Sequence, residues 1–400
     1  MLGGEIGMQT TKAMEKVCRD FSIFCDYVLE NRIKLSKTTG YISKKDCFEL
    51  NKLISVKESY EKATRTQNQY PVIHFFYYVA LKYRILEIDY TKMFLHEGRN
   101  YKSFVKSSEI EKYIFLIVIT INDMEFLEQN VCYKMDVGYL MNWLSEKCAH
   151  VDDEYQLPDN EFLWLTFDRI KISPILEELC LIKVMERPLC EKRRWQGTLK
   201  IKILPLFEMV AELYGSISKD NVAFWNRDVS DCLEIFLKAL VPKYQESKIF
   251  CLLQQSKEVN LCQAVDLEVK VRYTDVKRVI RMNLSNTLYS LHKMIQEAVQ
   301  FDDDHLFEFY VGLGMLKQAY SMSGGFNYRG EKYVEDTTLG DLELYKGMKF
   351  SYLFDFGDMW WFDIKVLDIL DFTVEKSEVI KEVNPAPEQY PQYDEEEYWE

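Results

Sequence analysis

The stretch that decides the fold runs from residue 266 to residue 273 and reads Asp-Leu-Glu-Val-Lys-Val-Arg-Tyr. Apolar and charged side chains alternate along it, which is typical of a strand with one buried and one exposed face. The alternation returns at Ile280, Met282 and Leu284, after a turn near Thr274-Asp275. We therefore expect a hairpin here, at the point where the chain leaves the helical pattern that precedes it.

A helix and three further strands are expected after this hairpin. The apolar side chains of the helix lie along one stripe: Leu288, Leu291, Ile295 and Ala298. Strand-like segments follow at residues 306–311, 348–356 and 361–370. A hairpin, a helix and returning strands predict a small β-grasp-like α+β domain at residues 265–372, in which one helix covers one face of a mixed sheet.

The region before the hairpin, residues 10–250, is dominated by helical periods. The apolar side chains of one expected helix share a face: Val17, Phe21, Phe24, Cys25 and Val28. Helical segments are twice followed by strand-like ones, at residues 85–95 and at 181–204. This order is typical of winged-helix units, and we expect one or two of them. A helical domain that simply contains a hairpin is the alternative interpretation.

Charge and composition divide the chain into four expected parts. A mainly helical region spans residues 1–250, a linker 251–264, the α+β domain 265–372 and an acidic disordered tail 373–400. The net charge is −14, yet residues 371–400 hold ten acidic side chains against two lysines. The body is therefore only mildly acidic, which argues against a protein that coats nucleic acid non-specifically.

Cysteine and hydropathy patterns narrow the class of protein. Ten cysteines occur without any Cys-x-x-Cys pair, which is typical of reduced, buried thiols. Neither they nor the five histidines have the spacing of zinc ligands, so we expect no metal and no cofactor. The most apolar run, residues 113–121, has about half of the ~20 residues that a membrane span requires. We expect a cytoplasmic protein without membrane contact and without a signal peptide.

Three motifs stand in order toward the C-terminus. Residues 287–296 read Thr-Leu-Tyr-Ser-Leu-His-Lys-Met-Ile-Gln, residues 304–309 Asp-His-Leu-Phe-Glu-Phe, and residues 352–360 Tyr-Leu-Phe-Asp-Phe-Gly-Asp-Met-Trp. They resemble the Ri-plasmid open-reading-frame-three-like family, whose members are also met as passenger proteins of insertion elements. The resemblance implies the α+β fold and an association with mobile elements, but no established reaction. The family usually has a histidine where this chain has Phe362.

The segment Asp355-Phe-Gly-Asp358 has two interpretations. In the structural one, Gly357 permits a tight turn and the two carboxylates accept backbone N–H groups within it. In the other, the turn is part of a ligand site, whose candidate residues are Asp355, Asp358, Trp360, His292 and His305. The same letters occur in a kinase metal-binding motif, but the chain lacks the other kinase motifs, so we reject that class.

A basic segment lies in the second strand-rich part and reads Cys190-Glu-Lys-Arg-Arg-Trp195. If its hairpin is a wing, Lys192, Arg193 and Arg194 are placed to contact phosphates while Trp195 stacks or packs. A solubilising loop with Trp195 against the core is the alternative.

The absence of recognisable catalytic motifs favours a non-enzymatic recognition or regulatory protein. Its expected partner is an unidentified protein, or DNA bound through the basic segment. The alternative is a ligand-binding protein or enzyme with a cleft near Asp355, Asp358, His292 and His305. A third possibility is an interaction protein of a plasmid or phage system that makes no nucleic-acid contact.

Overall fold

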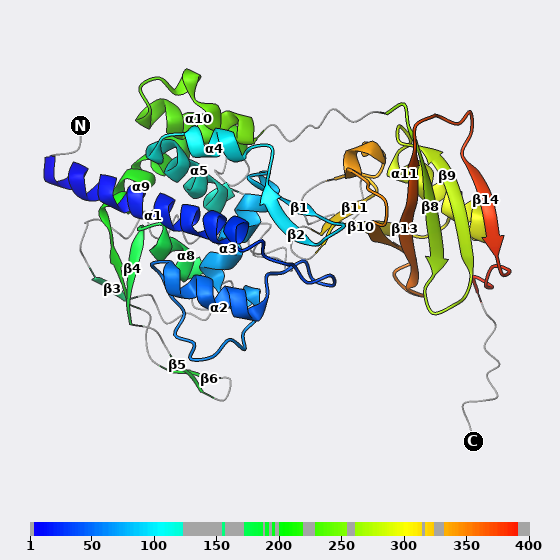
Figure 1. The fold of residues 1–400 in the computed structure, drawn as a ribbon, viewed down its shortest axis with the longest axis horizontal. Helices are drawn as coiled ribbons and strands as arrows, with labels where there is room; N and C mark the ends of the chain where they lie inside the picture. The colour runs from blue at the N-terminus through cyan, green and yellow to red at the C-terminus, as the bar shows by residue number, and fades with distance from the viewer. Residues whose placement is uncertain are drawn as a thin grey trace. The chain divides into compact units, whose positions relative to one another are not determined.

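The computed structural model divides the chain into two compact units, residues 1–255 (unit 1) and 256–400 (unit 2). The residues that it describes are 4–122, 154–156, 172–186, 189–191, 194–196, 200–218, 229–253, 261–313, 317–323 and 332–390. Figure 1 shows helices dominating unit 1 and strands dominating unit 2. The predicted mainly helical region followed by a sheet-plus-helix domain is confirmed.

Unit 1 is built from helices with short strands between them. Its helices are α1 (Gly4–Glu30), α2 (Lys44–Leu53), α3 (Pro71–Lys82), α4 (Tyr101–Lys106), α5 (Glu109–Asn122), α8 (Ile172–Glu178), α9 (Pro205–Ser218) and α10 (Val229–Leu240). Its strands are β1 (Leu86–Asp89), β2 (Phe94–Glu97), β3 (Glu154–Gln156), β4 (Ile182–Glu186), β5 (Leu189–Glu191), β6 (Arg194–Gln196) and β7 (Lys200–Ile203). Single 3-10 turns lie at Gln67–Gln69, Tyr244–Glu246 and Lys248–Leu252.

Helix α3 lies at the centre of unit 1. Ten of its twelve residues are buried, and Pro71 occupies its first turn, where a missing N–H costs nothing. The ring of Phe76 lies 5.2 Å from that of Phe21 and 6.0 Å from that of Phe24, so α1 packs directly against α3. The apolar run at residues 113–121 belongs to α5, and most of that helix is buried in the same core.

Two similar sets of elements occur in unit 1. In the first, β1 pairs with β2, and an isolated bridge joins Lys34 to Phe94 of β2. In the second, β7 lies between β3 and β4, and α8 immediately precedes β4. Each set therefore has a helix, a hairpin and a third short extended segment paired with it. The winged-helix assignment itself stays a prediction.

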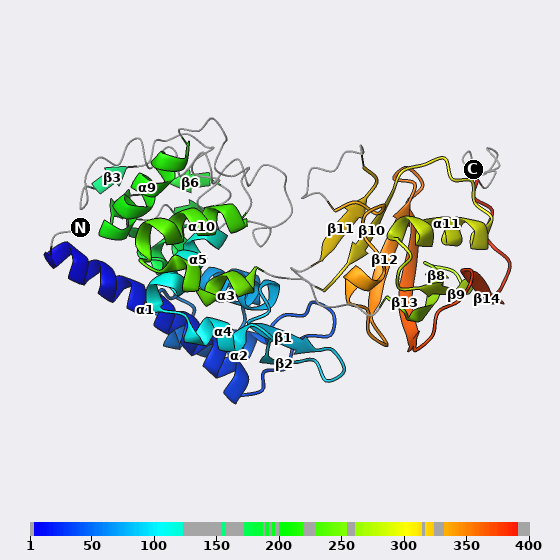
Figure 2. The ribbon, with the colours of Figure 1, turned by 90° about the horizontal axis from the view of Figure 1, so that it is seen from above.

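Unit 2 contains a seven-stranded sheet in the order β11-β10-β12-β13-β8-β9-β14. Its elements are β8 (Ala264–Val271), β9 (Lys277–Asn283), α11 (Leu288–Val299), β10 (Phe307–Val311), β11 (Gln318–Ser321), a 3-10 turn (Gly340–Leu342), β12 (Lys349–Phe354), β13 (Trp360–Leu370) and β14 (Glu378–Val383). Figure 2 shows α11 lying along one face of this sheet. The apolar residues of the predicted hairpin and of α11 belong to one buried cluster.

The sheet differs from the predicted mixed sheet, because its named strands pair antiparallel throughout. Short turns rather than crossovers join β8 to β9 and β12 to β13, and a short turn reverses the strand direction. The predicted hairpin is in the expected place, with Ala264 opposite Asn283 and Lys270 opposite Lys277.

Strand β14 corrects the prediction of a disordered tail over residues 373–400. It pairs with β9, and Arg278 of β9, whose side chain is buried, donates hydrogen bonds to the carbonyl oxygens of Val383 at 3.3 Å and Asn384 at 3.0 Å. These anchors lie more than ninety residues away in the chain, so local composition does not reveal them. Residues 391–400 lie outside the described part.

No helix among the described residues combines the length and the apolar character that crossing a membrane requires.

Candidate functional site

The turn between β12 and β13 is built by the carboxylate of Asp355. One of its oxygens accepts the backbone N–H of Gly357 at 2.8 Å and that of Asp358 at 3.4 Å. Asp355 and Met359 take left-handed backbone angles, with φ of 55° and 57°, so the unusual conformations fall beside Gly357 rather than on it. The carboxylate of Asp355 therefore plays the part that the structural interpretation gave to it and to Asp358 together. Asp358 contributes its N–H, and the residue itself is exposed.

His305 lies beside this turn, as the ligand-site interpretation expected. Its Nε2 is 3.5 Å from a carboxylate oxygen of Asp355 and 3.6 Å from one of Asp304, and the side chain is 40% exposed. The hydroxyl of Tyr390 donates to Asp304 at 3.0 Å. His305 is therefore partly exposed, whereas Asp355 is buried and held by the turn.

His292 belongs to the core rather than to an open site. Its ring is fully buried and stacks on Phe307 with the centroids 3.6 Å apart. Nδ1 lies 2.6 Å from the hydroxyl of Tyr352, and Nε2 lies 2.7 Å from a carboxylate oxygen of Asp303. Burial lowers the pKa of His292 to about 4, although Asp303 opposes this shift. The ring is therefore neutral at pH 7, and both nitrogens are engaged.

Trp360 also packs inside the unit. Its ring meets that of Phe301 edge-on at 4.9 Å, and its buried Nε1 has no hydrogen-bond partner in the described part of the chain. The structure thus places His305 with Asp355 and gives His292 a different carboxylate, Asp303. Sequence reasoning missed Asp303 and Tyr352. The run of three aspartates before His305 was the available signal, but it does not say which one turns inward.

A group of large apolar side chains is exposed around the same turn. Leu306, Phe356 and Met359 are 49%, 45% and 48% exposed, and Tyr390 is 45% exposed. The N–H of Asp355 donates to the carbonyl of Leu306 at 3.0 Å, which joins the two chain segments, and the ring of Tyr390 lies 6.4 Å from that of His305. We call these four residues the apolar corner.

The predicted basic segment forms hairpin β5–β6. Glu191 pairs with Arg194 and Cys190 with Trp195. Lys192 and Arg193, which connect these partners in the sequence, lie outside the described residues. The backbone arrangement is that of a hairpin, as the wing interpretation requires.

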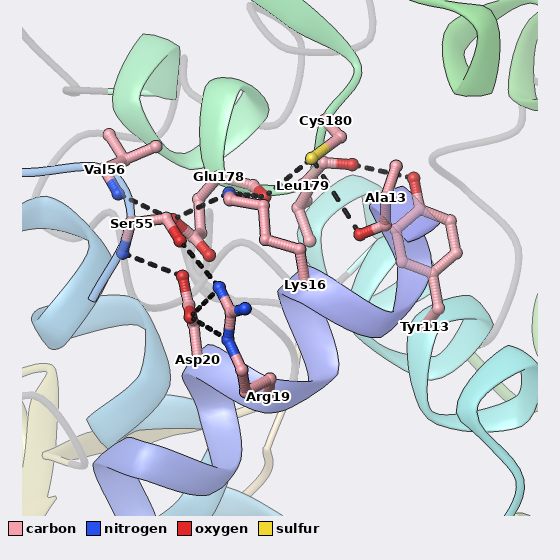
Figure 3. Close-up of polar contacts among 10 residues, drawn as sticks. All are labelled: Ala13, Lys16, Arg19, Asp20, Ser55, Val56, Tyr113, Glu178, Leu179 and Cys180. Atoms are coloured by element: carbon pink, nitrogen blue, oxygen red, sulfur yellow. Dashed lines mark hydrogen bonds and ion pairs between the residues drawn. The ribbon is translucent and has the colours of Figure 1, made fainter. Parts of the chain in front are cut away.

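Unit 1 holds a buried pair of carboxyl groups that sequence reasoning did not single out (Figure 3). The side chains of Glu178 and Asp20 are 0% and 1% exposed. Asp20 accepts the N–H of Ser55 at 2.8 Å, and Oε2 of Glu178 accepts that of Val56 at 3.2 Å. Lys16 Nζ lies 3.5 Å from the same oxygen. The pair therefore ties α8 to α1 and to the segment after α2.

The second carboxylate oxygen of Glu178 has no partner when the group is ionised. Burial raises the pKa of Glu178 to about 8, Lys16 opposes this shift, and the charge of Asp20 and a hydrogen bond to it reinforce it. Glu178 is therefore mostly protonated at pH 7, and in that form it is able to donate its O–H to Asp20. A protonated carboxyl is a donor, whereas an ionised one is not.

Residues 263–389 match the family of plasmid pRiA4b ORF-3-like proteins. The resemblance inferred from the three motifs is thereby confirmed. The matching residues, here called the ORF-3-like region, include His292, His305, the turn at residues 355–359 and β14.

A solved structure from Methanosarcina mazei Go1, described as the protein of unknown function MM3350, is also similar to this chain. The two are 22% identical, the alignment covers 31% of this chain and 71% of the other, and the TM-score is 0.28. A search of curated proteins gave no match.

The ORF-3-like region also has a shallow groove of about 450 Å³. It is lined by one side of α11 and by the segment before β14: Asn286, Tyr289, Ser290, Lys293, Met294, Glu375, Lys376 and Ser377. None of the five predicted ligand residues lines it. Within the described residues, no cluster of three His, Cys, Asp or Glu side chains is arranged to hold a metal ion.

Proposed function

We propose that the protein is a non-catalytic recognition protein that binds a protein partner through the apolar corner of the ORF-3-like region. The observation that carries the proposal is the exposure of three large apolar side chains, Leu306, Phe356 and Met359, at one end of the sheet. Several large apolar side chains exposed on neighbouring segments mark interaction sites more often than a single exposed one does. An association with mobile genetic elements is part of the proposal and rests on the family match.

The frame beneath the corner supports a recognition role. Two backbone N–H groups are fixed by the carboxylate of Asp355, and the Asp355 N–H is fixed by Leu306. A partner that docks here does not have to order the turn first, and this lowers the entropic cost of binding.

The contacts of the predicted site residues favour recognition over catalysis. A general acid or base needs a free nitrogen or oxygen within hydrogen-bond reach of a substrate. Both nitrogens of His292 are engaged inside the core, and Asp355 is committed to the turn. Only His305 has substantial exposure among these three.

DNA binding through unit 1 is the second candidate function, and hairpin β5–β6 with its basic residues supports it. In helix-turn-helix proteins a recognition helix lies exposed in the major groove. Here α3 and α8, the helices that precede the two hairpins, are largely buried and pack against one another. Among the described elements, hairpin β5–β6 is therefore the one to test for DNA contact, through Lys192, Arg193 and Arg194.

The proposal is tested by replacing two side chains of the apolar corner and comparing the proteins that the variants bind. The variant Phe356→Ser/Met359→Ser of the full chain is compared with Tyr273→Ser, a matched control because Tyr273 is 95% exposed in the same unit. The proteins compared are those that bind the purified wild-type chain directly. We expect the corner variant to bind them at least tenfold more weakly and the control to bind them as the wild type does. Equal binding by both variants would contradict the proposal.

The DNA alternative is tested with the triple change Lys192→Glu/Arg193→Glu/Arg194→Glu. Fluorescence anisotropy of a labelled duplex is measured with wild type and variant at low and high salt. Salt-sensitive binding by the wild type that the variant loses would support it. Equal anisotropy for both proteins would remove it.

A further inference from the structure

The segments that form the apolar corner carry only one sign of formal charge. The segments 301–306 and 354–360 contain five aspartates and no lysine or arginine. Asp303 is paired with Lys293 of α11, and Asp355 is committed to the turn. Asp302, Asp304 and Asp358 are exposed residues of the same two segments, and we call these three aspartates the rim.

Covering this corner with a partner removes water from the rim carboxylates. An ionised carboxylate that loses water without gaining a cation is strongly unfavourable. A neutral or acidic partner would leave that cost uncompensated, whereas lysine or arginine side chains would form charge-assisted hydrogen bonds with the same oxygens. The phosphate backbone of a nucleic acid would be repelled.

We propose that the corner binds a cationic segment of a partner protein, in which an apolar side chain is flanked by lysine or arginine. The apolar side chain covers Phe356 and Met359, and the flanking cations pair with Asp302 and Asp358. This inference rests on the proposed function and adds to it the chemistry of the partner. Complementary charge at such a rim chiefly raises the association rate and makes it sensitive to salt.

The test uses two labelled model peptides with the same leucines, one carrying lysine and the other glutamate at the remaining positions. Binding to the full-length protein is followed by fluorescence anisotropy at low and high salt. The rim variant is Asp302→Asn/Asp358→Asn. Its matched control is Asp275→Asn/Glu297→Gln, which removes two exposed negative charges elsewhere in the same unit.

We expect the lysine peptide to bind the wild type and the charge control alike, and to bind the rim variant at least tenfold more weakly at low salt. Phe356→Ser/Met359→Ser should lose binding at both salt concentrations. If the rim variant binds as well as the control while the apolar variant does not, the corner is a binding surface but the cationic inference is wrong. If neither variant affects binding, or if the wild type binds neither peptide or both equally, the inference is also overturned. Failure of the inference leaves the partner-capture experiment as a separate test of the proposed function.

Discussion

Glu178 carries its carboxyl group inside unit 1, and the surrounding groups select its protonated form. Burial removes the water that would stabilise the ionised group. Asp20 adds repulsion, and Lys16 recovers only part of the cost. The folded chain therefore keeps a proton that the unfolded chain releases above the ordinary pKa of a glutamate.

The sign of the resulting pH dependence follows from that difference. The pKa of Glu178 rises from 4.5 to about 8 on folding, so the folded state binds more protons between these values and loses stability as the pH rises through them. The slope is about 1.4 kcal/mol per pH unit for one proton. Above the upper value both states are ionised and the slope from this group ends.

Glu178→Gln should remove this slope, because glutamine does not ionise and its amide can donate to Asp20 in place of the protonated carboxyl. We expect the variant to be more stable than wild type at pH 7 by about 3 kcal/mol. The free energy of unfolding by urea, measured between about pH 5 and about pH 8, checks this. Glu15→Gln on the exposed face of α1 is the control and should keep the wild-type slope; a parallel slope in Glu178→Gln would show that another group is responsible.

The pair of His305 and Asp355 and the pair of Glu178 and Asp20 show which parts of a site can be predicted from a sequence. The ligand-site interpretation named His305 and His292 as neighbours of the turn at Asp355, and the structure places His305 3.5 Å from Asp355 but His292 beside Asp303. Glu178 follows another glutamate, and only its inward direction distinguishes the two. Its partner Asp20 lies far away in the chain, on a different helix, and packing between helices that distant is not encoded in a local pattern.

Among the elements, the hairpin β8–β9 is predictable from the sequence, whereas the strand β14 is not. The hairpin has one buried and one exposed face, and its alternation is clear. Strand β14 reads Glu-Val-Ile-Lys-Glu-Val and lies at the edge of the sheet, where little of it needs to be apolar. Its place is set by pairing with β9 and by the buried guanidinium of Arg278, which are long-range contacts.

Removing β14 should therefore destabilise unit 2, contrary to what a disordered tail would do. A chain truncated after Phe372 leaves Arg278 buried without the carbonyls of Val383 and Asn384. It also breaks the two hydrogen bonds of 2.8 Å between the Asn283 side chain and the backbone of Val374. We expect a loss of at least ~3 kcal/mol, because Arg278 keeps the carbonyls of Lys277 and Ala298 but also loses its ion pair with Glu382, and breaking a pair at a buried charge is strongly destabilising. Calorimetry of the full-length and truncated chains measures it.

The matched control for that truncation ends after Tyr390 and keeps β14. It should unfold as the full-length chain does. If the chain that ends after Phe372 also unfolds at the temperature of the full-length chain, β14 contributes nothing to stability and the segment behaves as a tail.

At the scale of the whole molecule, Glu178 in unit 1 and His292 in unit 2 are buried ionisable groups that respond to pH in opposite ways. Glu178 makes unit 1 less stable as the pH rises from 4.5 toward about 8. His292 has a pKa that falls from 6.5 to about 4 on folding, so the unfolded chain binds the additional proton between these values. Unit 2 therefore loses stability as the pH falls through that window, and its contribution is fully present above it.

The difference in stability between the two units should consequently change with pH. Relative to unit 2, unit 1 should unfold at a higher temperature near pH 5 than near pH 8. The contribution of His292 amounts to about 3 kcal/mol over its window. Calorimetry of the full chain at both pH values records the unfolding transitions. The variants assign them to the units: Glu178→Gln should change the pH response of the transition of unit 1, and His292→Gln that of the transition of unit 2.

His305→Gln is the control for the second assignment, since His305 is 40% exposed and keeps contact with water. We expect His292→Gln to lower the stability of unit 2 near pH 7, because its stacking on Phe307 is lost, and to remove most of the decline toward low pH. The control should retain that decline. A wild-type chain whose transitions keep the same separation at both pH values would mean that these buried groups do not govern the pH response of their units. A decline that survives in His292→Gln would mean that another group carries the acid sensitivity of unit 2.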